Sequence, residues 1–168
     1  SIVLITIYAG CKIYQSPKKV NLDRSWSVYK ADAAGTGYSV LDEINTSNVQ
    51  NLKIAWTHKF SDAPAGSRGG NSESNPIIID VVMYILSARH RAYALDATTW
   101  KQIWAFDPFN GEAGGGIGRG VTYWEEGTDK RILFTAGDKL YALNAQTGLP
   151  ISSFGNNGWV SMNVGMRG

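Results

Sequence analysis

The sequence predicts an all-β fold made of short antiparallel strands, and three observations support this prediction. The 168 residues include 19 Gly, 6 Trp and 8 Tyr, a mixture typical of short strands that are joined by tight turns and pinned by large aromatic side chains. No stretch shows the periodicity of a long amphipathic helix. Part of the sequence occurs twice with a period of 48 residues, so that Ala94 in the first copy corresponds to Ala142 in the second.

The repeat predicts the individual strands. Residues 84–88 and 91–100 align without gaps with residues 132–136 and 139–148. Short runs rich in aliphatic and aromatic residues predict strands in both units, at 76–80, 82–86, 92–95, 103–106, 121–124, 131–134, 140–143 and 151–154. Four strands per unit and a period of about 40 to 50 residues are typical of β-propeller blades.

The region before the repeat contains fewer predicted elements. Residues 48–50 predict a helical turn, and residues 52–56 predict a strand. Two blades cannot close a ring, because each blade has two apolar faces that need a neighbour. We therefore expect the sequence to be incomplete, and we expect the isolated chain to aggregate or to remain partly unfolded.

Composition and charge exclude some classes of protein. With 43% hydrophobic and 18% charged residues, the chain is globular rather than disordered. The 16 basic and 14 acidic residues are scattered and give a net charge of +2, so the sequence has no basic stripe for phosphate contacts. We expect no nucleic-acid partner.

The first 22 residues are expected to lie outside the folded part, residues 23–168. An apolar run over residues 1–10 is too short to cross a bilayer as a helix and indicates the remnant of a signal peptide. Cys11, the single cysteine, follows small residues as in a bacterial lipobox, and residues 11–22 predict a polar tether. Two alternatives stay open for Cys11: the lipidated N-terminus of an exported protein, or a core cysteine in a first strand.

The repeat carries a more specific resemblance. Residues 94–104 resemble the tryptophan-docking motif of quinoprotein dehydrogenases, Ala-x-Asp-x-x-Thr-Gly-Lys-x-x-Trp. In this motif Asp and Thr fix the turn by local hydrogen bonds, and the terminal Trp, here Trp104, is inserted between blades. Trp100 stands where the motif has Gly, which strains a left-handed turn by roughly 1 kcal/mol or imposes another turn type. The second copy keeps Gly148 but has Asn144 and no final Trp, which predicts a weaker lock.

Other segments resemble the same family, so the resemblance covers about residues 26–168. They comprise N-terminal signature segments and two early cofactor-site motifs, at 26–29, 38–49, 52–56, 73–84 and 119–124. Residues 107–109 and 119–123 are most similar to the glucose dehydrogenase branch. The resemblance implies a partial eight-bladed β-propeller that contains the first blades only, with pyrroloquinoline quinone (PQQ) as cofactor.

The resemblance also implies which residues bind this cofactor, a flat ortho-quinone with three carboxylates. Arg119 offers a planar cationic fork to a carboxylate or a quinone oxygen. Glu73 is implied as a second contact, which accepts a hydrogen bond or is held protonated beside a carboxylate. Alcohol-oxidising relatives have two adjacent cysteines where this chain has Ala113 and Gly114, so we expect the bare backbone of Gly114 to approach the quinone. The alternatives are a surface or inter-blade arginine and an exposed loop glutamate.

The implied reaction is the oxidation of a sugar, in particular glucose, or of an alcohol. An Asp base removes the hydroxyl proton, hydride passes to the quinone, and Ca²⁺ polarises the quinone oxygen. Electrons then leave to ubiquinone or a c-type cytochrome, in the periplasm or at the membrane. The base and the Ca²⁺ ligands are expected in later blades, so no catalytic or metal-binding residue is assigned here and this chain alone is expected to be inactive.

Less specific signals favour other interpretations. A non-catalytic propeller lipoprotein that serves as an outer-membrane assembly scaffold would explain the repeat and Cys11, but not Glu73 and Arg119. His58, in a predicted strand, and His90, in a turn between two strands, have no partner at metal-ligand spacing, and we expect both to be structural. The glycine run before Arg119 is not expected to bind a nucleotide, because no long helix follows it.

Overall fold

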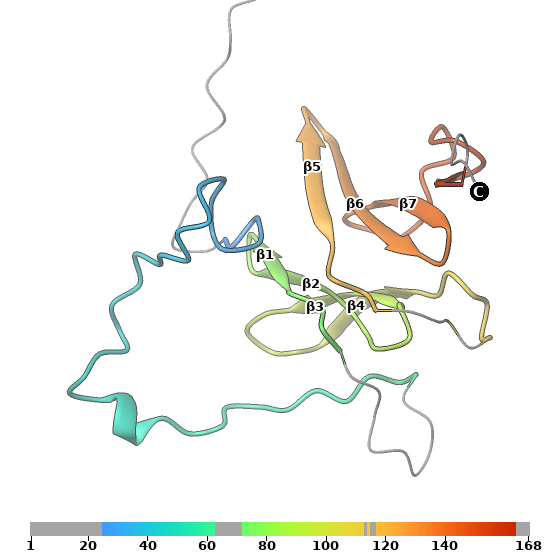
Figure 1. Cartoon of the computed structure of the whole chain (residues 1–168). Coiled ribbons are helices and arrows are strands. Elements are labelled where there is room, and N and C mark those ends of the chain that lie inside the picture. Colours follow the sequence, from blue (N-terminus) through green and yellow to red (C-terminus); the bar gives the residue numbers. More distant parts are fainter. Residues whose placement is uncertain (1–24, 63–71, 113, 115–116, 164–168) are drawn as a thin grey trace, which may run out of the picture.

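The computed structural model describes residues 25–62, 72–112, 114 and 117–163, and strands are the main regular secondary structure of this part of the chain. Its strands form two four-stranded antiparallel sheets (Figure 1). The first sheet, blade 1, contains β1 (Ile77–Ile79), β2 (Val82–Leu86), β3 (Ala92–Asp96) and β4 (Gln102–Phe106). The second sheet, blade 2, contains β5 (Thr122–Glu126), β6 (Asp129–Ala136), β7 (Lys139–Asn144) and β8 (Trp159–Ser161). Each sheet keeps the order of the sequence, so the predicted all-β fold of four-stranded propeller blades is confirmed.

Strands β1 to β7 lie within two residues of their predicted positions, but the last prediction is wrong. Residues 151–154 form a turn, in which the Phe154 N–H donates to the Ile151 carbonyl at 2.9 Å. Gly155 and Gly158 follow with φ angles of +53° and +101°, so the chain reverses direction again before β8 pairs with β7. The helical turn predicted at 48–50 is confirmed as the short 3-10 helix η1 (Val49–Asn51).

The repeat gives both blades the same turn after their third strand. In each turn the side-chain oxygen of the first residue accepts hydrogen bonds from the backbone N–H groups two and three residues later, at 2.8 Å for Asp96 and 3.0 Å for Asn144. The fifth residue of the turn is left-handed in both copies, with φ +61° at Trp100 and +71° at Gly148. Trp100 therefore keeps the turn type of the motif instead of imposing another.

The two blades are locked by aromatic side chains of blade 1. Tyr84, Ala94 and Trp104 are neighbours in the register of β2, β3 and β4, so their side chains share the face that meets blade 2. Trp104 Nε1 and Tyr84 OH both donate to the carbonyl oxygen of Ala145, at 2.9 and 3.2 Å. A Cβ at Gly148 would lie 2.6 Å from Trp104 Cδ2. The predicted insertion of Trp104 between blades is confirmed, and Gly148 makes room for its ring.

The opposite face of blade 1 is covered by residues 56–62. Tyr93 alternates with Ala94, so it points away from blade 2, and its ring lies 4.9 Å from that of Phe60. Trp56 stacks on Trp100, with 26° between the ring planes. The strand predicted at 52–56 is wrong, because these residues pair with none of the described strands.

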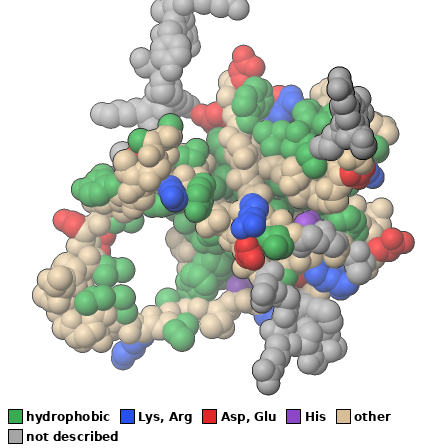
Figure 2. Space-filling view, in the orientation of Figure 1, with side chains coloured by type: hydrophobic (Ala, Val, Ile, Leu, Met, Phe, Trp, Pro, Cys, Tyr) green, Lys and Arg blue, Asp and Glu red, His purple; other side chains and the backbone are tan. Residues whose placement is uncertain are grey.

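An extended segment precedes this contact. It projects away from both sheets (Figure 1), and hydrophobic side chains are spread along its surface (Figure 2). The most exposed include Tyr38 at 72%, Ile44 at 61% and Ile54 at 83%. We call residues 38–55 the arm.

Residues 25–41 also leave a cavity beside blade 1. Trp26 forms an isolated bridge with Ile78 at the free edge of β1. The cavity has a volume of about 610 Å³, and its lining includes Trp26, Tyr29 and Ile78. Within the described ranges, no helix is both long and apolar enough to span a membrane.

Candidate functional site

The segments that lead into β1 and β5, the first strands of the two blades, lie side by side. Asn75 forms a parallel bridge with Gly120, and its N–H donates to the Arg119 carbonyl at 3.2 Å. Gly120 has φ +137°, and a Cβ there would lie 2.8 Å from the Asn75 carbonyl oxygen. Only glycine permits this close approach. The bridge therefore places Glu73 and Arg119, which are 46 residues apart in the sequence, at the same end of the two blades.

Glu73 and Arg119 form a short, exposed ion pair. Nη1 of Arg119 donates to Oε2 of Glu73 at 2.7 Å, and the two side chains are 77% and 43% exposed respectively. A pair in this environment contributes at most about 1 kcal/mol to stability. The pair holds a cation and an anion close together, but separating them costs little free energy. A ligand can therefore replace either partner.

Two serines fix the segment that carries Glu73. The Ser74 hydroxyl accepts a hydrogen bond from the Leu86 N–H at 3.1 Å, and the Ser72 hydroxyl donates to the Leu86 carbonyl at 3.4 Å. Sequence reasoning missed both residues. Their only signal is the alternation of serines on either side of Glu73, which indicates an extended segment with both hydroxyls on one side.

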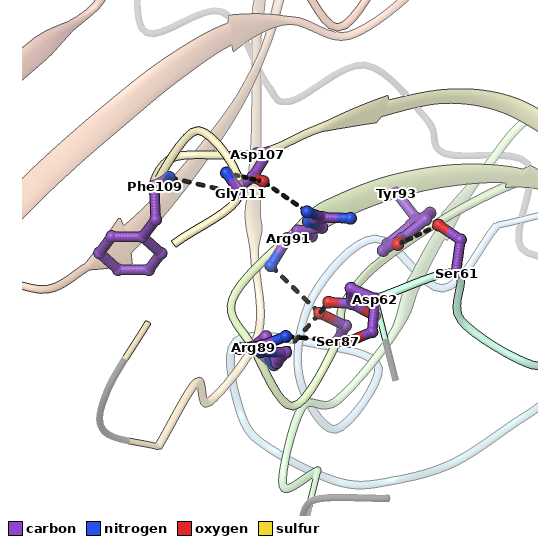
Figure 3. Close-up of polar contacts among 9 residues, drawn as sticks. All are labelled: Ser61, Asp62, Ser87, Arg89, Arg91, Tyr93, Asp107, Phe109 and Gly111. Atoms are coloured by element: carbon purple, nitrogen blue, oxygen red, sulfur yellow. Dashed lines mark hydrogen bonds and ion pairs between the residues drawn. The ribbon is translucent and has the colours of Figure 1, made fainter. Parts of the chain in front are cut away.

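The turn between β2 and β3 lies next to this segment and is held by hydrogen bonds (Figure 3). The Ser87 hydroxyl donates to Oδ2 of the buried Asp62 at 2.5 Å. The Ser87 hydroxyl oxygen in turn accepts hydrogen bonds from the backbone N–H groups of Arg89 and Arg91, at 3.3 and 3.1 Å. These hydrogen bonds fix the path of the chain from Ser87 to Arg91.

An ion pair joins this turn to the loop after β4 (Figure 3). Nη2 of Arg91 lies 2.6 Å from Oδ2 of Asp107. Although burial acts to raise it, the pKa of Asp107 is lowered by hydrogen bonds from the Phe109 and Gly111 N–H groups and by Arg91. No sequence signal indicated that these residues, on different elements, would meet.

Phe109 covers Gly114, the third residue predicted to contact the cofactor. A Cβ at Gly114 would collide with the Phe109 ring and would lie 3.0 Å from the Arg89 carbonyl oxygen. The Phe109 ring also reaches Gly137 of blade 2, where a Cβ would lie 3.7 Å away. Gly114 is thus required by protein packing, and its contact with a cofactor stays a prediction.

The two histidines lie in different environments. His90 occupies the β2–β3 turn, as predicted, with only 4% of its surface exposed. His58 lies outside any strand, contrary to the prediction, and its ring is edge-on to Phe60 at 5.1 Å between centroids. No cluster of three or more His, Cys, Asp or Glu residues that could bind a metal occurs in the described part of the chain.

Comparison with known proteins identifies the family. Residues 26–168 match the model of the PQQ family, described as the β-propeller domain of glucose/ethanol/alcohol dehydrogenases. The chain belongs to this family. The quinoprotein glucose dehydrogenase of Escherichia coli (strain K12) is 30% identical over 161 residues, which cover 86% of this chain and 20% of that protein. The dehydrogenase subunit of the alcohol dehydrogenase (quinone) of Gluconacetobacter polyoxogenes is 37% identical over 130 residues, which cover 74% of this chain and 16% of that protein.

Solved structures agree with this assignment to the quinoprotein dehydrogenases. The crystal structure of quinohemoprotein alcohol dehydrogenase from Comamonas testosteroni superposes with a TM-score of 0.67 at 27% identity, over 86% of this chain and 20% of that chain. The chain thus spans about a fifth of the length of the relatives it matches. The resemblance of the sequence to this family is confirmed.

The chemistry of the site fits the PQQ of this family. A ligand with three carboxylates needs cations and hydrogen-bond donors. The exposed guanidinium of Arg119 supplies a cation. At the same end of blade 1, neither ring nitrogen of the buried His90 has a hydrogen-bond partner among the described residues. The close backbone contact of Gly120 with Asn75 fixes the approach of Arg119 to this end.

Proposed function

We propose that this chain is the N-terminal part of a longer PQQ-dependent dehydrogenase that oxidises a sugar, with glucose as the first candidate, or an alcohol. The observation that carries the proposal is the meeting of Glu73 and Arg119 ahead of β1 and β5. Family membership and the fifth of a relative's length that the chain spans also support it. The similarity of residues 107–109 and 119–123 to the glucose dehydrogenase branch favours glucose.

The proposal gives Glu73, Arg119 and Gly114 distinct roles. Arg119 would bind a carboxylate or a quinone oxygen through its planar guanidinium, with the ligand replacing Glu73 as its partner. Glu73 would then accept a hydrogen bond from a ligand N–H. The backbone at Gly114 would complete the wall of the site. When bound, PQQ supplies the hydride acceptor for the oxidation of the alcohol group.

The remaining parts of the machinery are proposed for the rest of the polypeptide. These are the Asp base, the ligands of Ca²⁺ and the surface that transfers electrons to ubiquinone or a c-type cytochrome. One solved relative is a europium-containing methanol dehydrogenase, so Ca²⁺ needs to be compared with a lanthanide. Residues 1–22, which lie outside the described residues, support export to the periplasm, with Cys11 as a lipid anchor.

Quinone binding tests the roles of the site residues. In the full-length protein, we expect Arg119→Gln to weaken PQQ binding at least roughly tenfold, because a charge-assisted hydrogen bond is worth about 1.5–3 kcal/mol. Fluorescence titration with PQQ measures this affinity. Arg131→Gln is the matched control, because Arg131 also pairs with a carboxylate, Asp129, but lies in β6 opposite Trp124, toward the far end of β5 from Arg119. Equal affinities of the Arg119 and Arg131 variants would contradict the assignment of Arg119.

Substrate oxidation tests the reaction. With PQQ and Ca²⁺ bound, we expect the full-length protein to reduce an artificial dye in the presence of glucose. Ethanol and methanol in parallel assays separate a sugar enzyme from an alcohol enzyme, and a lanthanide in place of Ca²⁺ tests the metal. Absence of both PQQ binding and dye reduction would instead favour the non-catalytic scaffold.

A further inference from the structure

We propose that His90 is a positioning residue of the Glu73–Arg119 site, which acts on Arg119 through Gly118 and responds to the bound quinone. The inference rests on the proposed function, because it assumes that PQQ is the ligand of this site. Neither the resemblance nor the comparisons assign a role to this histidine.

The position of His90 connects it to both halves of the site. A Cβ at Gly118 would lie 3.2 Å from His90 Cδ2 and 3.2 Å from Leu86 Cδ1. The backbone directly before Arg119 therefore rests on the imidazole ring. Leu86 in turn binds the serines that flank Glu73. His90 and the end of β2 thus support the segments of both charged residues.

The burial and the backbone conformation of His90 both destabilise the folded protein. The residue is 4% exposed, and neither Nδ1 nor Nε2 has a hydrogen-bond partner among the described residues. A buried polar group without a hydrogen-bond partner destabilises the folded state. The backbone of His90 is also left-handed, at φ +63°, a conformation that is unfavourable for a residue with a Cβ. Trp100 shares both features and is explained by its stack on Trp56, but His90 rests against the backbone that carries Arg119, which points to a role at the site.

The groups around His90 indicate what its nitrogens can bind. Its sequence neighbours Arg89 and Arg91 and the nearby Arg119 are cations, and two of the three are paired, Arg91 with Asp107 and Arg119 with Glu73. A neutral imidazole offers one N–H donor and one acceptor nitrogen. The fitting partner is an oxygen of an anionic ligand, such as a carboxylate or a quinone oxygen, reached directly or through one ordered water.

His58 provides an internal control, since the sequence contains only 2 His. It lies on the other face of blade 1, among the rings of Phe60, Tyr93 and Trp100. Its Nε2 is also buried without a partner among the described residues, so it shares this feature with His90 but lies away from Gly118. A response to PQQ that is specific to the site should appear at His90 and not at His58.

Imidazole nitrogen NMR of the unsubstituted full-length protein tests the response, with histidine as the only ¹⁵N-labelled residue and His58→Gln and His90→Asn to assign the signals. On addition of PQQ we expect the nitrogen resonances of His90 to shift, and those of His58 to stay in place. Unchanged His90 resonances at saturating PQQ would overturn the inference.

Substitutions test the contact with Gly118. His90→Asn keeps a residue that tolerates a left-handed backbone and removes the ring. We expect it to weaken PQQ binding about tenfold, whereas His58→Gln leaves the affinity unchanged. Gly118→Ala should weaken binding in the unsubstituted protein and have a smaller effect in the His90→Asn background, where the ring no longer opposes the added methyl group. Equal effects of Gly118→Ala in both backgrounds would show that His90 does not act through Gly118.

These experiments separate the two proposals. If PQQ does not bind the unsubstituted protein, or if Arg119→Gln leaves the affinity unchanged, the proposed function itself is wrong. If PQQ binds and Arg119→Gln weakens it, but His90→Asn has no effect and the His90 signals do not move, only the role of His90 is wrong.

Discussion

At the scale of single residues, the surroundings of Tyr84 and Asp96 change their pKa values in opposite directions. Burial, and then the negative charge of Asp80, raises the pKa of Tyr84 from 10.0 to about 12. Hydrogen bonds from the Thr98 side chain and from the Thr99 and Thr98 N–H groups lower the pKa of Asp96 from 3.8 to about 2. Each shift links folding stability to pH, at opposite ends of the pH scale.

Tyr84→Phe tests the alkaline side. The raised pKa means that the contribution of Tyr84 to stability is complete below about pH 10 and is lost as the pH rises towards 12. Removing the hydroxyl also removes its hydrogen bond to Ala145, so we expect a loss of about 1 kcal/mol at neutral pH. The difference between the two proteins should shrink above pH 10. Urea denaturation of the full-length protein at pH 8 to 11.5 measures it, with the exposed Tyr29→Phe as control.

Asp96→Asn tests the acid side. The lowered pKa means that the contribution of the carboxylate is present above about pH 4 and is lost as the pH falls towards 2. Asn144 shows that an amide oxygen makes the same turn in blade 2. We therefore expect Asp96→Asn to fold normally at pH 7 and to show a smaller fall in melting temperature between pH 4 and 2 than the unsubstituted protein. An equal fall in both proteins would count against this assignment.

At the scale of elements, the repeated turn serves two different contacts. In blade 2 its left-handed residue, Gly148, lies against the Trp104 ring and leaves room for this side chain of blade 1. In blade 1 the equivalent residue, Trp100, stacks on Trp56 and holds the segment that covers the other face. The stack explains why a tryptophan is tolerated at φ +61° where the motif has glycine.

Gly148→Ala measures what the close contact with Trp104 contributes. The added Cβ would meet the ring at 2.6 Å and would also strain the backbone, so we expect a destabilisation of about 2–4 kcal/mol. Gly127→Ala is the matched control, because Gly127 has φ +60° with no atom within 4 Å of its Cβ position. It should lose only about 1 kcal/mol. Similar losses in chemical denaturation would mean that Trp104 moves aside easily.

At the scale of the whole molecule, local patterns predicted the blades, and long-range contacts explain the errors. Strands β1 to β7 were predictable because apolar runs and turn residues lie within each hairpin. The segments 52–56 and 151–154 have the composition of strands, but pairing depends on a free edge and on glycine turns that composition does not describe. The resemblance indicated Glu73 and Arg119 one by one. Their contact, and the burial of His90, depend on how β1, β2 and β5 pack.

The exposed apolar surface predicts the behaviour of the isolated chain. The arm exposes Tyr38, Ile44 and Ile54, and an apolar cavity of about 610 Å³ opens beside β1. Surfaces of this kind drive association unless they are covered. We expect the 168-residue chain alone to form soluble aggregates and to bind a hydrophobic dye, as measured by light scattering and by dye fluorescence. A monomer with a sharp, cooperative melting transition would contradict this expectation.

The shared acceptor between the blades has a consequence for how this sequence can evolve. Trp104 and Tyr84 both bind the backbone oxygen of Ala145, and every amino acid supplies such an oxygen. The lock is therefore encoded in the donors of one blade and needs no particular hydrogen-bonding side chain in the next. A new side chain at Ala145 would have to stay small, because the residue is only 2% exposed, but it would not need matching chemistry. Neighbouring repeats can thus change their hydrogen-bonding side chains independently, as long as Ala145 stays small and Gly148 leaves room for the Trp104 ring.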